Sequence, residues 1–81
     1  MEVDPPNWLP LELRIGARCA DFMWMFRQNG IERYKHLVTR QYLMLDSQGQ
    51  CYAEREGQLV VADFGDQLSR VTEAYVDRDQ I

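Results

Sequence analysis

The sequence has few of the residues from which metal sites and catalytic centres are built. It contains a single histidine, His36, and two cysteines, Cys19 and Cys51, that lie far apart in the chain. Zinc sites need several Cys or His ligands at short spacings, and the sequence has no C-x-x-C and no H-x-x-x-H pair. It also lacks the glycine-rich phosphate loops and the G-x-S-x-G nucleophile motif. We therefore predict no metal, no cofactor and no catalytic residue.

Long apolar runs are missing as well. The longest run, residues 22–26, is far shorter than the ~20 residues that a bilayer-spanning helix needs. The first ten residues, MEVDPPNWLP, lack the basic start and the long apolar centre of a signal peptide. We expect a cytoplasmic protein with no membrane partner, whose two cysteines stay reduced.

Negative charge exceeds positive charge, but the excess is unevenly distributed. The net charge is −4 and the isoelectric point is near 4.8, which argues against broad attraction to nucleic acid. Residues 11–40 carry six cations and three carboxylates, whereas residues 41–81 carry three cations and eight carboxylates. The acidic C-terminal half leaves open an inhibitor or antitoxin that masks a basic partner.

The length and periodicity of the chain predict one small α+β domain. A chain of 81 residues has room for a single small core. Short connections between successive β-rich runs favour an antiparallel meander of four to five strands, and apolar residues at helical spacing follow it. The sequence therefore predicts an extended arm over 1–8, a short helix over 10–20, a sheet over 21–62, and an amphipathic helix over 64–78 packed on one sheet face.

Two local signals bear on the ends of the expected helices. Gly16 weakens the N-terminal helix by about 1 kcal/mol relative to alanine. Asp63 stands directly before the C-terminal helix, where an aspartate side chain can accept a hydrogen bond from a free backbone N–H. We expect Asp63 to be the N-cap of that helix.

The strongest local signal is Asn29-Gly30, which lies between two β-rich runs. This pair is preferred in two-residue type I′ hairpin turns because both central residues take positive φ. Such a turn fixes the register of the hairpin. The predicted opposite pairs are Arg27 with Glu32, Phe26 with Arg33, Met25 with Tyr34, Trp24 with Lys35, and Met23 with His36.

This register distributes large apolar side chains over both faces of the hairpin. Strict alternation assigns Phe22, Trp24, Phe26 and Leu37 to one face, and Met23, Met25 and Tyr34 to the other. A single covering helix cannot bury both sets, and a sheet that exposes apolar area commonly uses it for binding.

The favoured function is a non-enzymatic binding module that forms a homodimer through this hairpin. The expected contact residues are Trp24, Met25, Phe26, Tyr34 and Lys35. Another hypothesis is a small-molecule or enzymatic site between sheet and helix, with His36 and Tyr42 in its pocket. A third is a single-stranded nucleic-acid module, disfavoured by the net charge but supported by rings beside cations. The residues concerned are Trp24, Tyr34 and Tyr42 with Arg33, Lys35 and Arg40.

Overall fold

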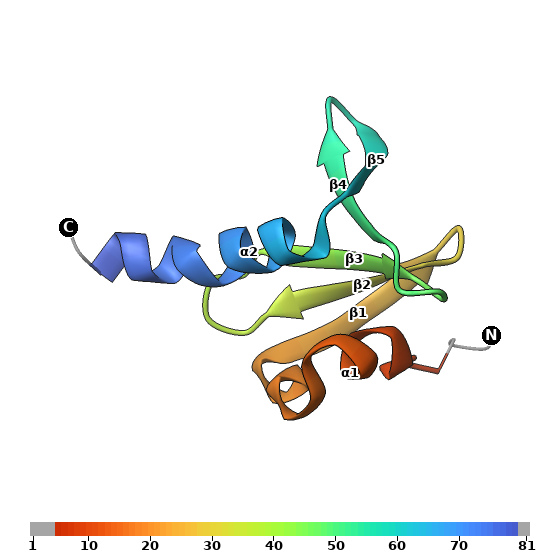
Figure 1. The fold of residues 1–81 in the computed structure, drawn as a ribbon, viewed down its shortest axis with the longest axis horizontal. Helices are drawn as coiled ribbons and strands as arrows, with labels where there is room; N and C mark the ends of the chain where they lie inside the picture. Colours follow the sequence, from red (N-terminus) through yellow and green to blue (C-terminus); the bar gives the residue numbers. More distant parts are fainter. Residues whose placement is uncertain (1–4, 80–81) are drawn as a thin grey trace.

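Five antiparallel strands form one sheet, and two helices pack against one of its faces (Figure 1). The computed structural model describes residues 5–79, and for residues 73–79 it describes the backbone alone. The elements are α1 (Leu9–Ile15), the 3₁₀ helix η1 (Gly16–Asp21), β1 (Phe22–Gln28), β2 (Ile31–His36), β3 (Tyr42–Asp46), β4 (Cys51–Arg55), β5 (Gln58–Ala62) and α2 (Phe64–Asp79). The first four residues of the expected arm lie outside the described residues.

The strand order β1-β2-β3-β4-β5 confirms the predicted meander. Asn29 and Gly30 have φ values of 54° and 77°, as a type I′ turn requires. Glu56 and Gly57 turn the β4–β5 hairpin with similar values of 54° and 83°. These two-residue turns pair β1 with β2 and β4 with β5, and the connections over 37–41 and 47–50 are also short. Short connections favour pairing between strands that are neighbours in the chain, which is why the topology follows from the sequence.

The start of the C-terminal helix is as the sequence predicts, whereas the N-terminal helix ends earlier than expected. Asp63 accepts a hydrogen bond from the Asp66 N–H at 3.0 Å and so caps α2. Gly16, with φ of 57°, ends α1, and the chain continues as the 3₁₀ helix η1. The helix expected over 10–20 is therefore two short helical segments. No helix within the described residues combines the length and the apolar character needed to cross a membrane.

The register of the first hairpin is confirmed next to the turn and wrong farther from it. Arg27 lies opposite Glu32, and Phe26 lies opposite Arg33, but the register then shifts by one residue. A β-bulge places an additional residue in one strand and reverses the alternation beyond it. Met25 falls at this irregularity. The predicted pairs Met25–Tyr34, Trp24–Lys35 and Met23–His36 are replaced by Trp24–Tyr34, Met23–Lys35 and Phe22–His36.

The bulge also corrects the expected division of side chains between the two faces. Trp24 lies opposite Tyr34, and both pack with the core on the helix side of the sheet. Met23 and Phe26 lie opposite Lys35 and Arg33 on the other side. The core beneath the helices consists of Leu11, Phe22, Tyr34, Leu43, Leu45, Cys51 and Val71.

Candidate functional site

The sheet face turned away from the helices carries exposed apolar side chains. Met23, Phe26 and Tyr42 retain 49%, 42% and 40% of their accessible surface. Their strand partners on this face are the cations Arg33 and Lys35, because Met23 pairs with Lys35, Phe26 with Arg33, and Lys35 with Tyr42. We call this surface the open face and define it by Met23, Phe26, Arg33, Lys35, Tyr42 and Met44.

Each exposed ring of the open face has a cation beside it. The Arg33 guanidinium carbon lies 5.2 Å from the centre of the Phe26 ring. The Lys35 ammonium nitrogen lies 5.9 Å from the centre of the Tyr42 ring. Both distances fall within the range of cation–π attraction, about 6 Å. The rings are therefore held in position from one side while about two fifths of each side chain stays exposed.

Arg33 is incompletely satisfied. Its Nη1 lies 3.1 Å from the Met44 sulfur, and its Nη2 donates a long bond of 3.5 Å to the Gln28 side-chain oxygen. Its Nε is buried and has no hydrogen-bond acceptor among the described residues. A thioether is a weak acceptor and the bond to Gln28 is long, so the two Nη atoms, rather than the buried Nε, keep donor capacity for an anion.

A cleft adjoins the open face where β3 and β4 separate. The two strands share only the pairs Met44–Tyr52 and Leu45–Cys51, and the β4–β5 hairpin rises away from β3 (Figure 1). The cleft has a volume of about 440 Å³. It is lined by Arg40, Gln41, Tyr42, Met44, Ala53, Glu54, Arg55, Gln67 and Arg70. We call it the arginine cleft, because three of these side chains are arginines and one is a carboxylate.

Positive charge is concentrated on these two surfaces. The open face and the arginine cleft together carry five of the nine cations of the chain, in a molecule whose net charge is −4. The sole ion pair between described side chains joins Arg27 to Glu32 on the covered side of the sheet. The five cations, Arg33, Lys35, Arg40, Arg55 and Arg70, thus have no carboxylate partner among the described residues.

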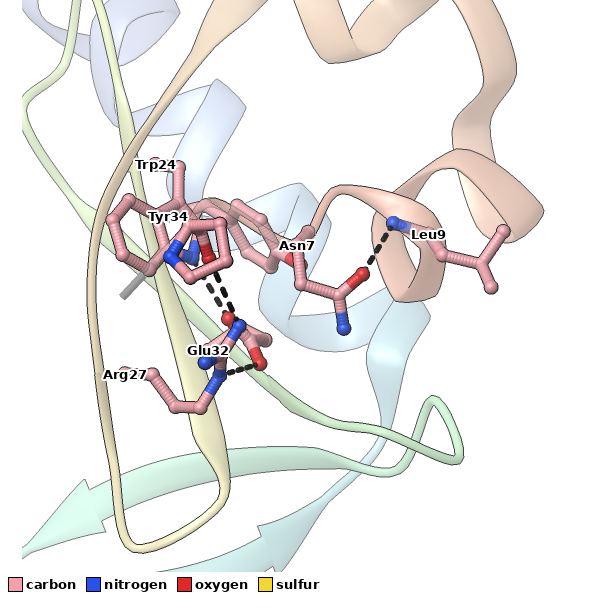
Figure 2. Close-up of polar contacts among 7 residues, drawn as sticks. Asn7, Leu9, Trp24, Arg27, Glu32 and Tyr34 are labelled. Carbon is pink, nitrogen blue, oxygen red and sulfur yellow. Dashed lines mark hydrogen bonds and ion pairs between the residues drawn. The ribbon is translucent and has the colours of Figure 1, made fainter. Parts of the chain in front are cut away.

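Two of the predicted contact residues lie beneath the helices. Tyr34 is fully buried, and its hydroxyl donates a hydrogen bond of 2.6 Å to the Asn7 carbonyl oxygen. Trp24 is half-buried and donates from Nε1 to the Glu32 carboxylate at 2.8 Å. Figure 2 shows Trp24 and Arg27 meeting at Glu32, beside Tyr34 and Asn7. These side chains hold the first hairpin and the segment before α1 together.

The remaining predicted residues are distributed over both sides of the sheet. Phe26 and Lys35 lie on the open face, and Met25 is half-buried at the bulge. Of the pair expected to share a pocket, Tyr42 lines the arginine cleft, whereas His36 lines a separate hollow of about 120 Å³ with Met23 and Lys35. The structure therefore does not bring His36 and Tyr42 together in one cavity.

His36 has a structural partner in the turn after β2. Its Nδ1 accepts hydrogen bonds of 3.2 Å from the N–H groups of Val38 and Thr39, and its ring meets Phe22 edge-on at 5.1 Å between ring centres. Nδ1 can accept these bonds only while it carries no proton. The imidazole orders the turn that presents Arg40 to the cleft.

Neither cysteine has the surroundings of a nucleophile. Burial raises the pKa of the Cys51 thiol to about 11, and partial burial together with the Glu12 charge raises the pKa of Cys19. Reactive thiols instead have a lowered pKa. Both thiols are free. Within the described part of the chain, no three His, Cys, Asp or Glu side chains are grouped to hold a metal ion.

Sequence reasoning missed part of this surface. Met23 was expected to lie on the same face as Tyr34, and the bulge moved it to the open face. Arg55 and Arg70 come from β4 and α2 and reach Arg40 only because β3 and β4 diverge. No sequence signal marks that divergence. Searches of protein families, curated proteins and solved structures find no match to this chain.

Proposed function

We propose that this protein is a non-enzymatic binding module whose open face binds single-stranded nucleic acid. The observation that carries the proposal is the alternation of exposed rings with cations that have no carboxylate partner among the described side chains, with Phe26 beside Arg33 and Tyr42 beside Lys35. Single-strand-binding sheets use flat side chains to stack bases and cations to meet phosphates. The low number of nearby carboxylates leaves these cations available to phosphate.

The net charge, which disfavoured nucleic acid at the level of the sequence, does not describe this surface. The one carboxylate that lines the adjoining hollow with Phe26 and Arg33 is Glu54. Local potential decides where a charged ligand binds, whereas net charge acts mainly over longer distances and is screened by salt. An acidic molecule with one cationic face is therefore compatible with a polyanionic ligand.

The homodimer predicted from the first hairpin is less well supported. Trp24 and Tyr34, two of its expected contacts, face the core. A second copy stacked on the open face would bring Arg33 and Lys35 of both copies close together, and like charges across an interface lower affinity. Self-association and a cytoplasmic location both stay predictions.

Fluorescence anisotropy with labelled single strands of DNA and RNA, about 12 nucleotides long, tests the proposal at low salt. We expect binding to both, and we expect the double variant F26A/Y42A to weaken it at least tenfold, since stacking contributes about 1–3 kcal/mol per base. Both rings are partly exposed, so the fold should tolerate their removal.

Leu13→Ala is the matched control, because Leu13 is 78% exposed on α1 and lies outside the open face. It should bind as the unmodified protein does. Failure of every strand to bind at low salt, or equal binding by F26A/Y42A, would refute the proposal. A dimer seen by light scattering that F26A/Y42A dissociates would point to self-association instead.

A further inference from the structure

We infer that the arginine cleft binds the terminal phosphate of the strand held by the open face. The inference rests on the proposed function and adds to it a subsite, a ligand group and a preference for one kind of strand end. The cleft is formed by the β2–β3 turn, β3, β4 and α2. It shares Tyr42 and Met44 with the open face, but Arg55 and Arg70 lie outside that face and can be altered separately.

The charges that line the cleft match a phosphate monoester. Arg40, Arg55 and Arg70 supply three positive charges and Glu54 supplies one negative charge, which leaves a formal excess of two. A phosphate monoester carries about −1.5 to −2 charges at pH 7, because its second pKa is near 6. A phosphodiester within the strand carries about −1. The cleft is therefore better matched to a strand end than to the strand interior.

The side chains suit the geometry of such a group. Guanidinium groups present several donors in a fixed fork and bind phosphate oxygens in pairs. Arg40 lies in the turn between β2 and β3. Its φ of 67° is a left-handed conformation that is uncommon for residues other than glycine. None of the three arginines is engaged by a carboxylate among the described side chains.

The cleft continues the open face. Tyr42, Met44 and Glu54 line both the cleft and the hollow beside Phe26 and Arg33. A base stacked on the exposed side of Tyr42 would leave its own phosphate at the mouth of the cleft. One strand can then reach the ring of Tyr42 and the arginines without a change in the fold.

The test compares three oligonucleotides of one sequence that carry a 5′ phosphate, a 3′ phosphate or neither. We expect one phosphorylated form to bind about tenfold more tightly than the unphosphorylated strand at pH 7.5. The difference should shrink at pH 5.5, where the monoester carries a single charge. R70Q, and separately R55Q, should abolish the difference, while R18Q, a matched change of an exposed arginine in η1, should keep it.

A second arm uses inorganic phosphate and amide NMR shifts, so that failure of the cleft and failure of the open face can be told apart. Shifts confined to the cleft residues without binding of any oligonucleotide would retain the phosphate subsite and refute nucleic-acid binding. Equal binding of all three oligonucleotides, with no shifts from phosphate, would refute the subsite and retain the open face. A phosphoserine peptide that binds as tightly as the phosphorylated strand would refute the assignment to nucleic acid.

Discussion

Glu32 is an ionisable side chain buried on the helix side of the sheet, among apolar residues. It is 2% exposed, and its two oxygens accept hydrogen bonds from Trp24 Nε1 and Arg27 Nε. A buried carboxylate is tolerated only when its partners replace the lost water. The same contacts join β1 to β2 on the side of the sheet opposite the open face. Glu32 therefore stabilises the strand pair that presents Phe26 and Arg33.

We therefore expect Glu32→Gln to lower the free energy of unfolding by about 2–3 kcal/mol. The change removes the negatively charged partner of the partly buried Arg27, and it leaves one of the two donors without a good acceptor. Urea unfolding followed by circular dichroism measures the change.

The matched comparison is Trp24→Phe, which removes a single hydrogen bond and keeps a ring at the position. It should lower the free energy of unfolding by about 1 kcal/mol. If E32Q were as stable as the unmodified protein, the contacts of Glu32 would not be what holds β1 and β2 together.

The two thiols differ in burial and should differ in reactivity. Cys51 is 1% exposed and its pKa is raised to about 11 by desolvation, so almost no thiolate forms at pH 8. Cys19 is half-buried. With Ellman's reagent at pH 8 we expect the Cys19 thiol to react first and the Cys51 thiol to react only as the protein unfolds. Cys19→Ser should remove the early phase, and rapid labelling that persists in C19S would contradict the prediction.

At the scale of the elements, turn chemistry decided what could be predicted. Asn29-Gly30 joins β1 to β2, Glu56-Gly57 joins β4 to β5, and Asp63 sets the start of α2. The bulge at Met25 could not be predicted, because the run FMWMF is apolar at every position and gives no alternation from which a shift could be read. A one-residue shift exchanges the two faces. Phe26 and Lys35, expected as contact residues, and Tyr42, expected in a pocket, lie on the open face. The register from which the contacts were argued was partly wrong, and their role in binding stays a prediction.

The β3–β4 turn is organised by Asp46. Its Oδ1 accepts hydrogen bonds of 2.9 Å from the N–H groups of Gln48 and Gln50, and its Oδ2 accepts one of 2.9 Å from the Tyr52 hydroxyl. Partial desolvation acts to raise the pKa of Asp46, but these hydrogen bonds outweigh it and lower the pKa below its usual value. The turn sets where β4 leaves β3, and hence where the cleft opens.

Because the pKa of Asp46 is lowered in the folded state, its stabilisation is complete above the pKa of an unfolded aspartate, near 3.9, and is lost as pH falls through the lower folded value. Asp46→Asn keeps an acceptor for the turn but removes the charge. We expect D46N to unfold at lower urea concentration than the unmodified protein at pH 7, and we expect this difference to narrow as the pH falls to 2.5.

Ser47→Ala is the control for this turn. Ser47 is exposed, and its side chain makes no hydrogen bond with any described residue. It should leave the urea midpoint unchanged at both pH values. A difference between D46N and the unmodified protein that stayed constant from pH 7 to pH 2.5 would show that the charge of Asp46 is not what stabilises the turn.

At the scale of the whole molecule, charge is segregated by the fold. The cations at 33, 35 and 40 come from the middle of the chain, and those at 55 and 70 from its acidic second half. The separation of β3 from β4 brings both groups to one side. Composition could not predict this, because it counts charges without placing them. A basic surface on an acidic protein can therefore be recognised only from the three-dimensional arrangement.

This arrangement makes the salt dependence of binding a quantitative test. Each phosphate neutralised on a single strand contributes about −0.7 to the slope of log K against log salt concentration. If Arg33 and Lys35 of the open face and Arg40 of the arginine cleft each meet one phosphate, the slope is about −2. R33Q/K35Q should then reduce its magnitude by about 1.4 units. R18Q should keep the full slope, since Arg18 lies in η1. A slope near zero, or an unchanged slope in R33Q/K35Q, would mean that phosphates do not contact the open face, whatever the affinity measured at one salt concentration.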